Sequence, residues 1–502
     1  MPLKNITQLK TITAYQKIMM KNFTLLLALL IGTFLQAQQT DFVKTFTVEE
    51  AVQYAISNNF DAKNSKLDVD KARWRNWEIK SMGLPTLSAA AEYDYYFKQP
   101  QIPSIEKIFN DPNSITTQVF GYLAMKDPNI LQMLYNYSVN NKDTKISFVM
   151  PHNFNTSLTL SQLLLDGRYF IGLKATRDFT KVARLQKDLS DQDIRYNVMK
   201  AYYQAQAAKE SKQYLEEVKV LVEKITSDTR KIYKEGLTEE LDVNRLELTL
   251  SNLESQLNIT EKMATVALAN LKFQMGLDLG SEIILTDKIS DLRAKMDPSV
   301  LPNFEPSKRI EYQLLETVIR VRHYDTQQRR SGHFPSLVGF LNYGWQAQVD
   351  KFGNFFKSRE VSYPDGDVRK KSNWFQTGIV GLKLSVPIFD SGNKMAQTQQ
   401  GKLDEQKSKN DFEKFKQASA LQFQSSQAFF AQALSEEQYS QKSVELSQKI
   451  FNKTNIKFKE GVGNSFELVQ AQQELIQNRL KFIQAQLNLL NTKADLDKAV
   501  GK

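Results

Sequence analysis

The 502-residue sequence contains no cysteine and only three histidines. Without cysteine there is no disulfide framework, thiolate zinc site or cysteine nucleophile, and no residue that could carry a lipoprotein anchor. His152, His323 and His333 are scattered without the spacing of metal ligands, so we interpret them as loop or surface residues. We therefore predict neither a metal site nor a cofactor.

Long hydrophobic runs and catalytic motifs are also missing. After residue 37 no stretch reaches 18 apolar residues, so we expect no membrane-spanning helix there, and a membrane protein with this sequence would have to be a β-barrel. There is no G-x-x-x-x-G-K-[ST] phosphate loop, no H-E-x-x-H and no G-x-S-x-G nucleophile elbow. We therefore predict that the protein is not an enzyme.

Residues 1–37 are typical of a secretory signal peptide. Lys21 precedes the apolar run 23–31, which leads to the small residue Ala37. This run is too short to span a bilayer, although an uncleaved anchor is the alternative. The first 18 residues are interpreted as an upstream extension, with translation starting at position 19 or 20.

The net charge is mild once this signal is removed. Residues 1–37 hold four lysines and no acid, so their cleavage lowers the formal net charge from +10 to +6. No finger, basic zipper or RNA-binding signature accompanies this excess. We therefore predict no nucleic-acid partner.

The chain repeats itself at an interval of 225 residues. The repeated phrases end in the glycine pairs Gly167 and Gly392, Gly236 and Gly461, and Gly276 and Gly501. A repeat of this length indicates one architecture built from two similar halves. We expect a first repeat over 38–280, a linker over 281–304 and a second repeat over 305–502.

Helices are predicted for most of each half. Thr47 opens a helix, with Glu50 completing a capping box, that runs to about residue 82, and its counterpart covers about 306–330. Longer helices, free of internal proline, are expected at about 167–235, 241–275, 392–460 and 466–500. Their apolar positions lie three or four residues apart, and glycine turns join them in pairs. Each pair is predicted to form an antiparallel coiled-coil hairpin.

Two long strands are predicted between the helices of each half. The hydrophobic period changes to two after Pro85 and Pro335. We expect strands at about 85–98, 147–165, 335–348 and 374–389, joined by loops at 99–145 and 350–373. Such strands are long enough to cross a bilayer when tilted. Aromatic residues near the loop ends suit an interfacial girdle, although ordinary soluble hairpins carry aromatics too.

Four strands are too few to close a barrel, since the smallest single-chain outer-membrane barrels have eight. Open edges would leave unpaired backbone groups in lipid, at several kcal/mol each. Three chains supply twelve strands, an even number that suits an antiparallel ring. We therefore predict an α+β membrane protein in which each chain gives four strands to a trimeric 12-stranded β-barrel, with the helices forming an α-barrel.

The chain resembles the TolC-type outer membrane efflux protein family, the outer membrane factors. The resemblance rests on the strand starts Pro85-Thr86-Leu87 and Pro335-Ser336-Leu337, on the segment 384–392, and on the turn phrases at 234–243 and 459–471. It implies a homotrimer in outer membrane lipid, with its helical tunnel in the periplasm. It also implies an exit duct of a tripartite efflux pump or type I secretion system, which passively conducts substrates that an inner-membrane exporter delivers through a periplasmic adaptor (membrane fusion protein). Drug, metal-ion, peptide and protein exporters share this duct.

The resemblance places a gate near the inner turns. Exporters of the family can carry acidic residues six and nine positions after the second turn glycine, where this chain has Glu467 and Gln470. One ring of three carboxylates, which would favour cations, is therefore expected. The alternative is that Glu467 is an ordinary solvated glutamate in the first turn of a helix.

Asp242 is the corresponding acid of the first repeat. In one exporter of the family this aspartate is tied to a tyrosine and an arginine, whose places are taken here by Phe458 and Gly463. Neither phenylalanine nor glycine can form a charged pair with Asp242. We hypothesise that apolar packing of Phe458 holds the closed state instead.

The two inner turns are the expected adaptor-docking tips, which are formed by Gly236, Leu237, Gly461, Val462 and Gly463. Their glycines are also plain helix terminators. The main alternative function is a soluble periplasmic coiled-coil scaffold or adaptor. The long amphipathic strands argue against it, because an adaptor has no use for paired hairpins of membrane length.

Overall fold

A computed structural model of the chain describes residues 44–102, 146–147, 149–296, 303–362 and 366–502. The expected signal peptide and most of the loop 99–145 lie outside these ranges. The chain divides into two units. The strand unit comprises residues 70–182 and 316–410, and the hairpin unit comprises residues up to 69, 183–315 and 411–502.

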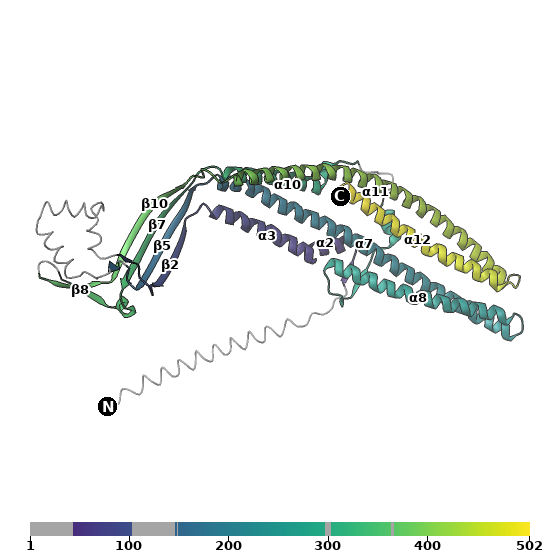
Figure 1. Ribbon diagram of the computed structural model, residues 1–502. Helices are drawn as coiled ribbons and strands as arrows, with labels where there is room; N and C mark the ends of the chain where they lie inside the picture. The colour runs from purple at the N-terminus through teal and green to yellow at the C-terminus, as the bar shows by residue number, and fades with distance from the viewer. Residues whose placement is uncertain (1–43, 103–145, 148, 297–302, 363–365) are drawn as a thin grey trace, which may run out of the picture. The chain divides into compact units, whose positions relative to one another are not determined.

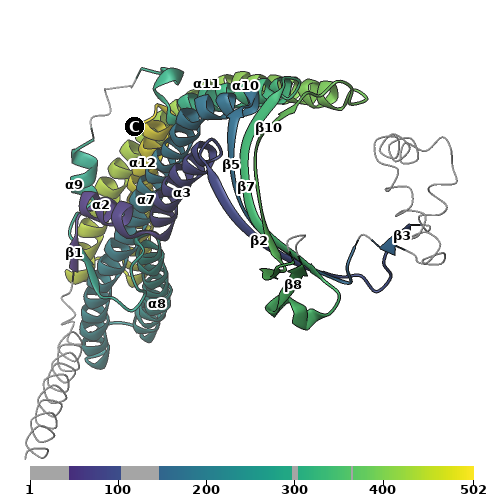
Figure 2. The ribbon, with the colours of Figure 1, turned by 90° about the vertical axis from the view of Figure 1, so that its left-hand side faces the viewer.

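The strand unit contains a four-stranded antiparallel sheet in the order β10-β7-β5-β2 (Figure 1). Its strands are β2 (Thr86–Tyr95), β5 (His152–Leu165), β7 (Ser336–Val349) and β10 (Trp374–Ser385). The pairing of β5 with β7 joins the strands of the two halves of the sequence, and a register shift between Leu163 and Leu165 interrupts this pair. Figure 2 shows the curvature of the sheet. Within the described chain, β10 and β2 are edge strands that pair on one side only.

The two faces of this sheet differ in polarity. Residues that are directly opposite one another in neighbouring strands share a face. One face therefore carries Leu87, Ala89, Tyr93, Phe154, Leu158, Leu160, Leu341, Tyr343, Trp345, Val380, Leu382 and Leu384, together with His152, Thr156, Gln162 and Gln376. The other face carries Ser88, Glu92, Asn155, Ser157, Thr159, Asn342, Gln346, Thr377 and Lys383, together with Phe340, Phe375 and Ile379. The first is called the apolar face below.

Three strands are shorter than the sequence predicted. β2 ends at Tyr95 and not at residue 98, and proline explains the differences in the other two. β10 ends at Ser385 and not at residue 389, since Pro387 has no N–H to donate to a ladder. β5 begins at His152, directly after Pro151, and not at residue 147. The residues Ile146–Ser147 form a separate strand, β4, which pairs with β3 (Gln101–Ile102).

The connection between β7 and β10 is a folded element and not an open loop. It contains the 3₁₀ helix η2 (Phe352–Phe356) and a hairpin of β8 (Ser358–Ser362) and β9 (Val368–Ser372). Phe355 of η2 is 4% exposed and lies about 6 Å, between ring centres, from both Phe154 and Trp374. Since Phe154 and Trp374 share the apolar face, η2 packs on that face.

Four long helices form the two hairpins. They are α7 (Gly167–Lys234), α8 (Glu240–Met275), α11 (Asn393–Lys459) and α12 (Ser465–Ala499). Two ion pairs of 2.9 Å, one heptad apart, join α7 to α8, namely Lys212–Glu261 and Lys219–Glu254. This regular cross-helix pairing is typical of an antiparallel coiled coil.

The first predicted helix is interrupted at a position that no sequence pattern marks. The capping box of Thr47 and Glu50 is confirmed, but α2 (Val48–Asn58) ends before Asn59, and α3 (Phe60–Ser81) follows. The side chain of Asn59 accepts from the N–H of Asp61 at 2.7 Å and donates to the carbonyl of Gln274 at 2.7 Å. The buried amide therefore caps α3 and at the same time ties the break to α8.

The second half contains a similar break at Arg309. It separates the short 3₁₀ turn η1 (Pro306–Lys308) from α10 (Ile310–Ser331), and Arg309 itself is extended, with ψ of 140°. Its guanidinium is 4% exposed, donates to Glu311 at 2.7 Å and to Gln422 at 2.9 Å, and lies over the ring of Phe415. These partners satisfy a buried charge that would otherwise be costly.

Left-handed glycines end four helices at the repeat interval. Gly236, Gly276, Gly461 and Gly501 have φ of 77°, 72°, 72° and 85°. Each glycine N–H bonds the carbonyl three residues earlier, and the next N–H bonds the carbonyl five residues earlier, as in a Schellman motif. Gly276 lies against the Asn59 break, and Gly501 lies against the Arg309 break.

The segment expected as a linker, 281–304, contains ordered elements. Its strand β6 (Ile283–Leu285) pairs in parallel with β1 (Lys44–Phe46), and helix α9 (Ile289–Ala294) follows. The buried Tyr202 of α7 donates its hydroxyl to the carbonyl of Phe46 at 2.9 Å. Ile283, Leu285, Ile289 and Leu292 of this segment therefore belong to the core of the hairpin unit.

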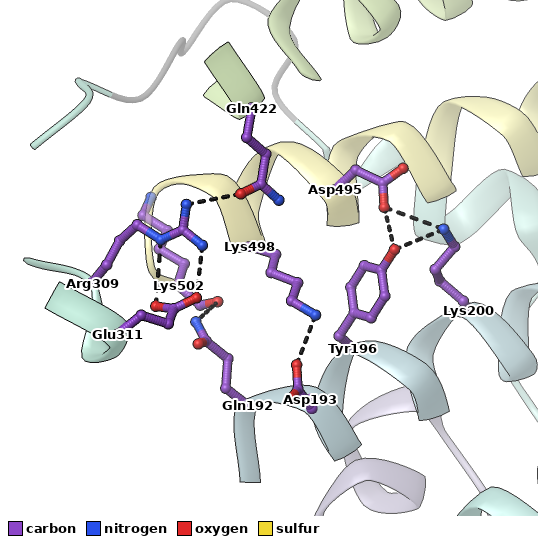
Figure 3. Close-up of polar contacts among 10 residues, drawn as sticks. All are labelled: Gln192, Asp193, Tyr196, Lys200, Arg309, Glu311, Gln422, Asp495, Lys498 and Lys502. Carbon is purple, nitrogen blue, oxygen red and sulfur yellow. Dashed lines mark hydrogen bonds and ion pairs between the residues drawn. The ribbon is translucent and has the colours of Figure 1, made fainter. Parts of the chain in front are cut away.

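A polar cluster fixes the end of α12 in the same unit (Figure 3). Asp495 accepts from the hydroxyl of Tyr196 at 2.5 Å and from Lys200 at 3.2 Å. Lys498 pairs with Asp193 at 2.7 Å. These side chains join the last turns of α12 to α7, so the end of the second hairpin is held by charge as well as by packing.

We predict that Gly276→Ala destabilises the protein more than Gly236→Ala. Both substitutions place alanine at positive φ, which costs roughly 1–2 kcal/mol. A Cβ on Gly276 would also lie 2.8 Å from the carbonyl oxygen of Asn58, whereas one on Gly236 meets nothing within 4 Å. Thermal unfolding followed by circular dichroism should give the lower Tm for Gly276→Ala. Equal shifts would show that the contact with the helix break is unimportant.

Candidate functional site

The candidate site lies at the two inner turns of the hairpin unit, where α7 leads into α8 and α11 into α12. Leu237 is 78% exposed at the first turn and Val462 is 77% exposed at the second. An added Cβ on Gly236 or Gly461 would meet nothing within 4 Å, so both tips are open. Gly463 differs, because its backbone lies against Lys457 and Phe458. Each tip therefore presents one uncovered apolar side chain.

Asp242 ties the first turn of α8 to the first turn of α12. Its carboxylate accepts one hydrogen bond from the hydroxyl of Ser465 and another from the hydroxyl of Thr238 at 2.8 Å. Ser465 is fully buried. The structure thus supplies a neutral partner from the second hairpin at the place where the sequence offered only Phe458 and Gly463.

The ionisation of Asp242 reflects this environment. Partial burial acts to raise the pKa of its carboxyl, but the hydrogen bonds from Ser465 and Thr238 outweigh burial and hold the pKa below its usual value of 3.8. The positive charge of Arg245 acts in the same direction. Asp242 is therefore a carboxylate throughout the physiological range, and its hydrogen bonds are charge-assisted.

Arg245 forms a second contact between the same helices. Its guanidinium lies 5.5 Å from the centre of the Phe466 ring, which belongs to the first turn of α12. A cation over an aromatic ring contributes about 0.5–1 kcal/mol at an exposed position. Asp242 and Arg245, one turn apart on α8, thus contact the adjacent residues Ser465 and Phe466.

Sequence reasoning did not identify Ser465 or Phe466 as site residues. The available signal was Asn464, whose side chain accepts from the N–H of Glu467 at 2.8 Å and caps α12. This cap predicts that Ser465 is the first residue of the helix. It does not predict that Ser465 faces Asp242, because the hydroxyl reaches that carboxylate only through the packing of one hairpin on the other.

Phe458 lies in an apolar cluster just above the turns. It is half-buried and packs against a core formed by Ile225, Leu246, Phe451, Leu468, Ala471 and Leu475. These residues come from all four long helices. The aromatic ring thus contributes to the packing that holds the two hairpins together near their tips.

Glu467 and Gln470 are exposed on α12. The backbone N–H of Glu467 donates a hydrogen bond to the side chain of Asn464. The side chains of Glu467 and Gln470 form no hydrogen bond with another residue in the described ranges. The structure therefore brings Asp242 to the turn of α12 that carries Glu467, but leaves Glu467 and Gln470 themselves in contact with solvent.

The described residues contain no group of three acidic or histidine side chains that could hold a metal ion. None of the helices in the described ranges is both long and apolar enough to cross a membrane.

Comparisons with known proteins identify solved structures that have a similar fold. One similar protein is CusC, whose crystal structures concern conformational changes on folding and transmembrane channel formation. CusC is 15% identical to this chain, and the match covers 90% of this chain and 92% of CusC with a TM-score of 0.65. The CmeC outer membrane channel of Campylobacter jejuni is 15% identical over 90% and 85% of the two chains, with a TM-score of 0.63. The open state of the MtrE outer membrane channel of Neisseria gonorrhoeae is 16% identical over 90% and 88%, with a TM-score of 0.64. At these identities the likeness shows the fold. No curated protein matches the sequence.

The chain therefore has the fold of outer membrane channels that combine long helical hairpins with an amphipathic sheet. Residues 314–502 match the family described as outer membrane efflux protein. This match covers the second half of the chain and confirms the resemblance found in its strand starts and turn phrases. The expected location in the outer membrane is confirmed with it.

We predict that Ser465→Ala loosens the two tips relative to each other. Because the chain has no cysteine, spin labels on Leu237→Cys and Val462→Cys report the distance between the tips directly. The distance distribution should be narrow at pH 7 and should broaden when Ser465 is replaced. Ser443→Ala, which removes only a bond within α11, is the control and should leave it unchanged.

The same labels test the pH dependence of the tie. The pKa of Asp242 is lowered in the folded protein, so the tie is present above the usual pKa of 3.8 and is lost as the pH falls through the lowered value. Acid should therefore broaden the distribution in the parent protein and have less effect in Ser465→Ala. An equal response of both would show that Asp242 does not hold the tips.

Proposed function

We propose that the protein is the outer membrane exit duct of a tripartite efflux pump or type I secretion system. It passively conducts substrates that an inner-membrane exporter delivers through a periplasmic adaptor. The observation that carries this proposal is the sheet of the strand unit, whose two faces differ in polarity along strands of membrane length.

The polarity of the sheet matches the lipid and the lumen of a barrel. Strands of transmembrane barrels alternate apolar side chains toward lipid with polar side chains toward a water-filled interior. The four strands have 10, 14, 14 and 12 residues, and about 9–11 suffice to cross a bilayer when tilted. The apolar face with its leucines suits lipid, and the face with Glu92, Asn155 and Lys383 suits a conducting lumen.

The edges of the sheet require further copies of the chain. Outward backbone groups of β10 and β2 would each cost several kcal/mol if left unpaired in lipid. Pairing β10 of one chain with β2 of the next closes a ring of twelve strands from three chains. This heterologous contact repeats around a threefold axis, so closure needs no other protein.

The helices of the hairpin unit carry surfaces that suit the same assembly. On α8, the exposed Ile259, Met263, Val266 and Phe273 follow one another at helical spacing. On α11, Leu421, Phe429, Tyr439, Leu446 and Ile450 are exposed. In the proposed trimer, the α8 surface of one chain packs against the α11 surface of its neighbour and extends the ring as a helical tunnel.

The inner turns supply the gate of this tunnel. The bond from Ser465 to Asp242, the Arg245–Phe466 contact and the packing of Phe458 hold the two hairpins together at their tips. Opening requires the second hairpin to move away from the first, and this movement must break these contacts. The exposed Leu237 and Val462 offer the adaptor an apolar docking point on each tip.

Glu467 gives the proposed gate its charge. It is exposed in the first turn of α12, two residues beyond Ser465. Three copies around the axis form a ring that favours cations. Reversal potentials in a salt gradient measure this preference, and an unchanged preference in Glu467→Gln would exclude the ring.

The proposed function is tested by fractionation and reconstitution. We expect the protein in the outer membrane fraction, as a trimer after cross-linking, with ion conductance when the trimer is inserted into a planar bilayer. Recovery in the soluble periplasm without conductance would support a coiled-coil scaffold or adaptor instead. The sheet makes the scaffold the weaker proposal, because a soluble protein gains nothing from an exposed apolar face of membrane width.

We predict that Phe458→Ala raises the passive conductance of the trimer in a planar bilayer. Truncation of a packed phenylalanine typically costs about 3–5 kcal/mol when it is fully buried, and less for this half-buried ring. Unfolding measurements should show that the barrel persists, since Phe458 lies in the hairpin unit. Phe60→Ala, which truncates an exposed aromatic at the start of α3 in the same unit, serves as the matched control. No change in conductance for Phe458→Ala would exclude apolar packing as the lock.

A further inference from the structure

A cavity of about 460 Å³ lies beside the core of the hairpin unit. Its described lining comes from α2, α7, α9 with the two residues that follow it, and α12, together with Lys502. The same four helices contribute to the hydrophobic core of the unit (Figure 2). Pockets of this volume take small organic ligands. We call it the Tyr203 cavity.

The inner wall of the Tyr203 cavity is apolar. Val52, Leu292 and Leu490 line it and are buried in the core. Met199 and Met296 line it as well and pack against the same core. Methionine is unbranched and adapts to irregular partners. This wall therefore suits apolar side chains of a ligand.

A buried tyrosine of the same wall has a hydroxyl without a partner. Tyr203 is 6% exposed, lines the cavity and forms no hydrogen bond with any residue of the described ranges. Its neighbour Tyr202, by contrast, donates to the carbonyl of Phe46 at 2.9 Å. Buried polar groups are nearly always hydrogen-bonded, so Tyr203 marks the place of an acceptor from a ligand. Burial raises the pKa of this hydroxyl, which therefore stays protonated and can donate.

Some charged side chains of the lining already compensate one another, and these carry no part of the argument. Lys493 donates to Asp497 at 2.5 Å, and Lys295 lies 3.9 Å from Asp287. Three charged lining residues form no hydrogen bond or ion pair through their side chains within the described part of the chain, namely Glu49, Arg195 and Lys502.

The unpaired cations lie at one end of the cavity. Arg195 precedes Tyr203 by two helical turns on α7, which separates the two residues by about 12 Å along the helix axis. Lys502 lies at the Arg195 end, because its carbonyl accepts from the side chain of Gln192 at 3.1 Å (Figure 3). This end of the cavity is therefore positive.

The unpaired acid lies at the other end. Glu49 follows Phe46 by three residues, and the carbonyl of Phe46 is bound by Tyr202, next to Tyr203 in the chain. After burial, the negative charge of Glu49 is the largest influence that raises the pKa of Tyr203. The cavity is thus negative beside the free hydroxyl and positive about two helical turns away.

We propose that the Tyr203 cavity binds a short apolar peptide of about three residues with both termini free. Three extended residues span roughly 10 Å, which is close to the separation of the two charged ends. The carboxylate of the peptide pairs with Arg195, its ammonium pairs with Glu49, and one of its carbonyls accepts from the hydroxyl of Tyr203. A fatty acid or an alkyl amine answers only one of the two charges. The cavity lies within one unit of a single chain, so the inference does not depend on the proposed duct.

The test uses the purified full chain in detergent, with the tripeptide Ala-Leu-Ala as the probe. Isothermal titration calorimetry compares the parent with Tyr203→Phe, which keeps the ring and removes only the hydroxyl. We expect about fivefold weaker binding, the usual contribution of one hydrogen bond. Tyr233→Phe removes an exposed hydroxyl from the same helix outside the cavity and should bind like the parent.

Blocked peptides test the two charged ends separately. Acetylation of the amino terminus should weaken binding to the parent about threefold, as expected for an exposed ion pair, and should cause no further loss in Glu49→Gln. Amidation of the carboxyl terminus should behave in the same way with Arg195→Gln. Glu49 and Arg195 are exposed, so both variants should fold like the parent. Arg184→Gln, an exposed arginine of α7 outside the cavity, is the control.

Three results would overturn the proposal. The first is the absence of saturable tripeptide binding by the parent, which would leave the hydroxyl to water. The second is equal binding by the parent and Tyr203→Phe. The third is binding of octanoate or octylamine as tight as that of the tripeptide, which would assign the cavity to a singly charged amphiphile.

Discussion

The proposed duct depends on one constraint, which is that backbone N–H and C=O groups in lipid must be paired. The four-stranded sheet satisfies this requirement internally, but within the described chain its edge strands β10 and β2 pair on one side only. In the proposed trimer these two edges meet. The polarity of the faces, the length of the strands and the exposed surfaces of α8 and α11 all agree with that closure.

The hairpin unit meets a different requirement, since long solvated helices need defined ends and defined contacts. Left-handed glycines end the helices, and two of them, Gly276 and Gly501, close against the breaks at Asn59 and Arg309. At the opposite ends, polar contacts join the hairpins next to the apolar cluster that contains Phe458. A carboxylate, a hydroxyl, a cation and an aromatic ring join the hairpins there. Polar contacts of this kind suit a place where the proposed duct must open and close.

Much of the fold could be predicted from local sequence. The change of period after Pro85 and Pro335 predicted the strands, and the absence of proline predicted the long helices, because both signals act through the backbone itself. The break at Asn59 was not predicted, since it depends on a hydrogen bond to Gln274, which lies 215 residues away. Ser465 was missed for the same reason. Its hydroxyl acts as a site residue only because it donates a hydrogen bond to Asp242, which lies 223 residues earlier in the chain.

The sequence by itself determined the long helices and the four long strands, their order, the repeat interval and the resemblance to a family, because periodicity, proline and glycine constrain a chain over a few residues. The tertiary structure decided which side chains meet. It paired Asp242 with Ser465, folded the connection after β7 onto the apolar face, and placed residues of the expected linker in the core. These outcomes depend on contacts between distant segments, and the free energy of such contacts comes from packing and desolvation that no local pattern contains.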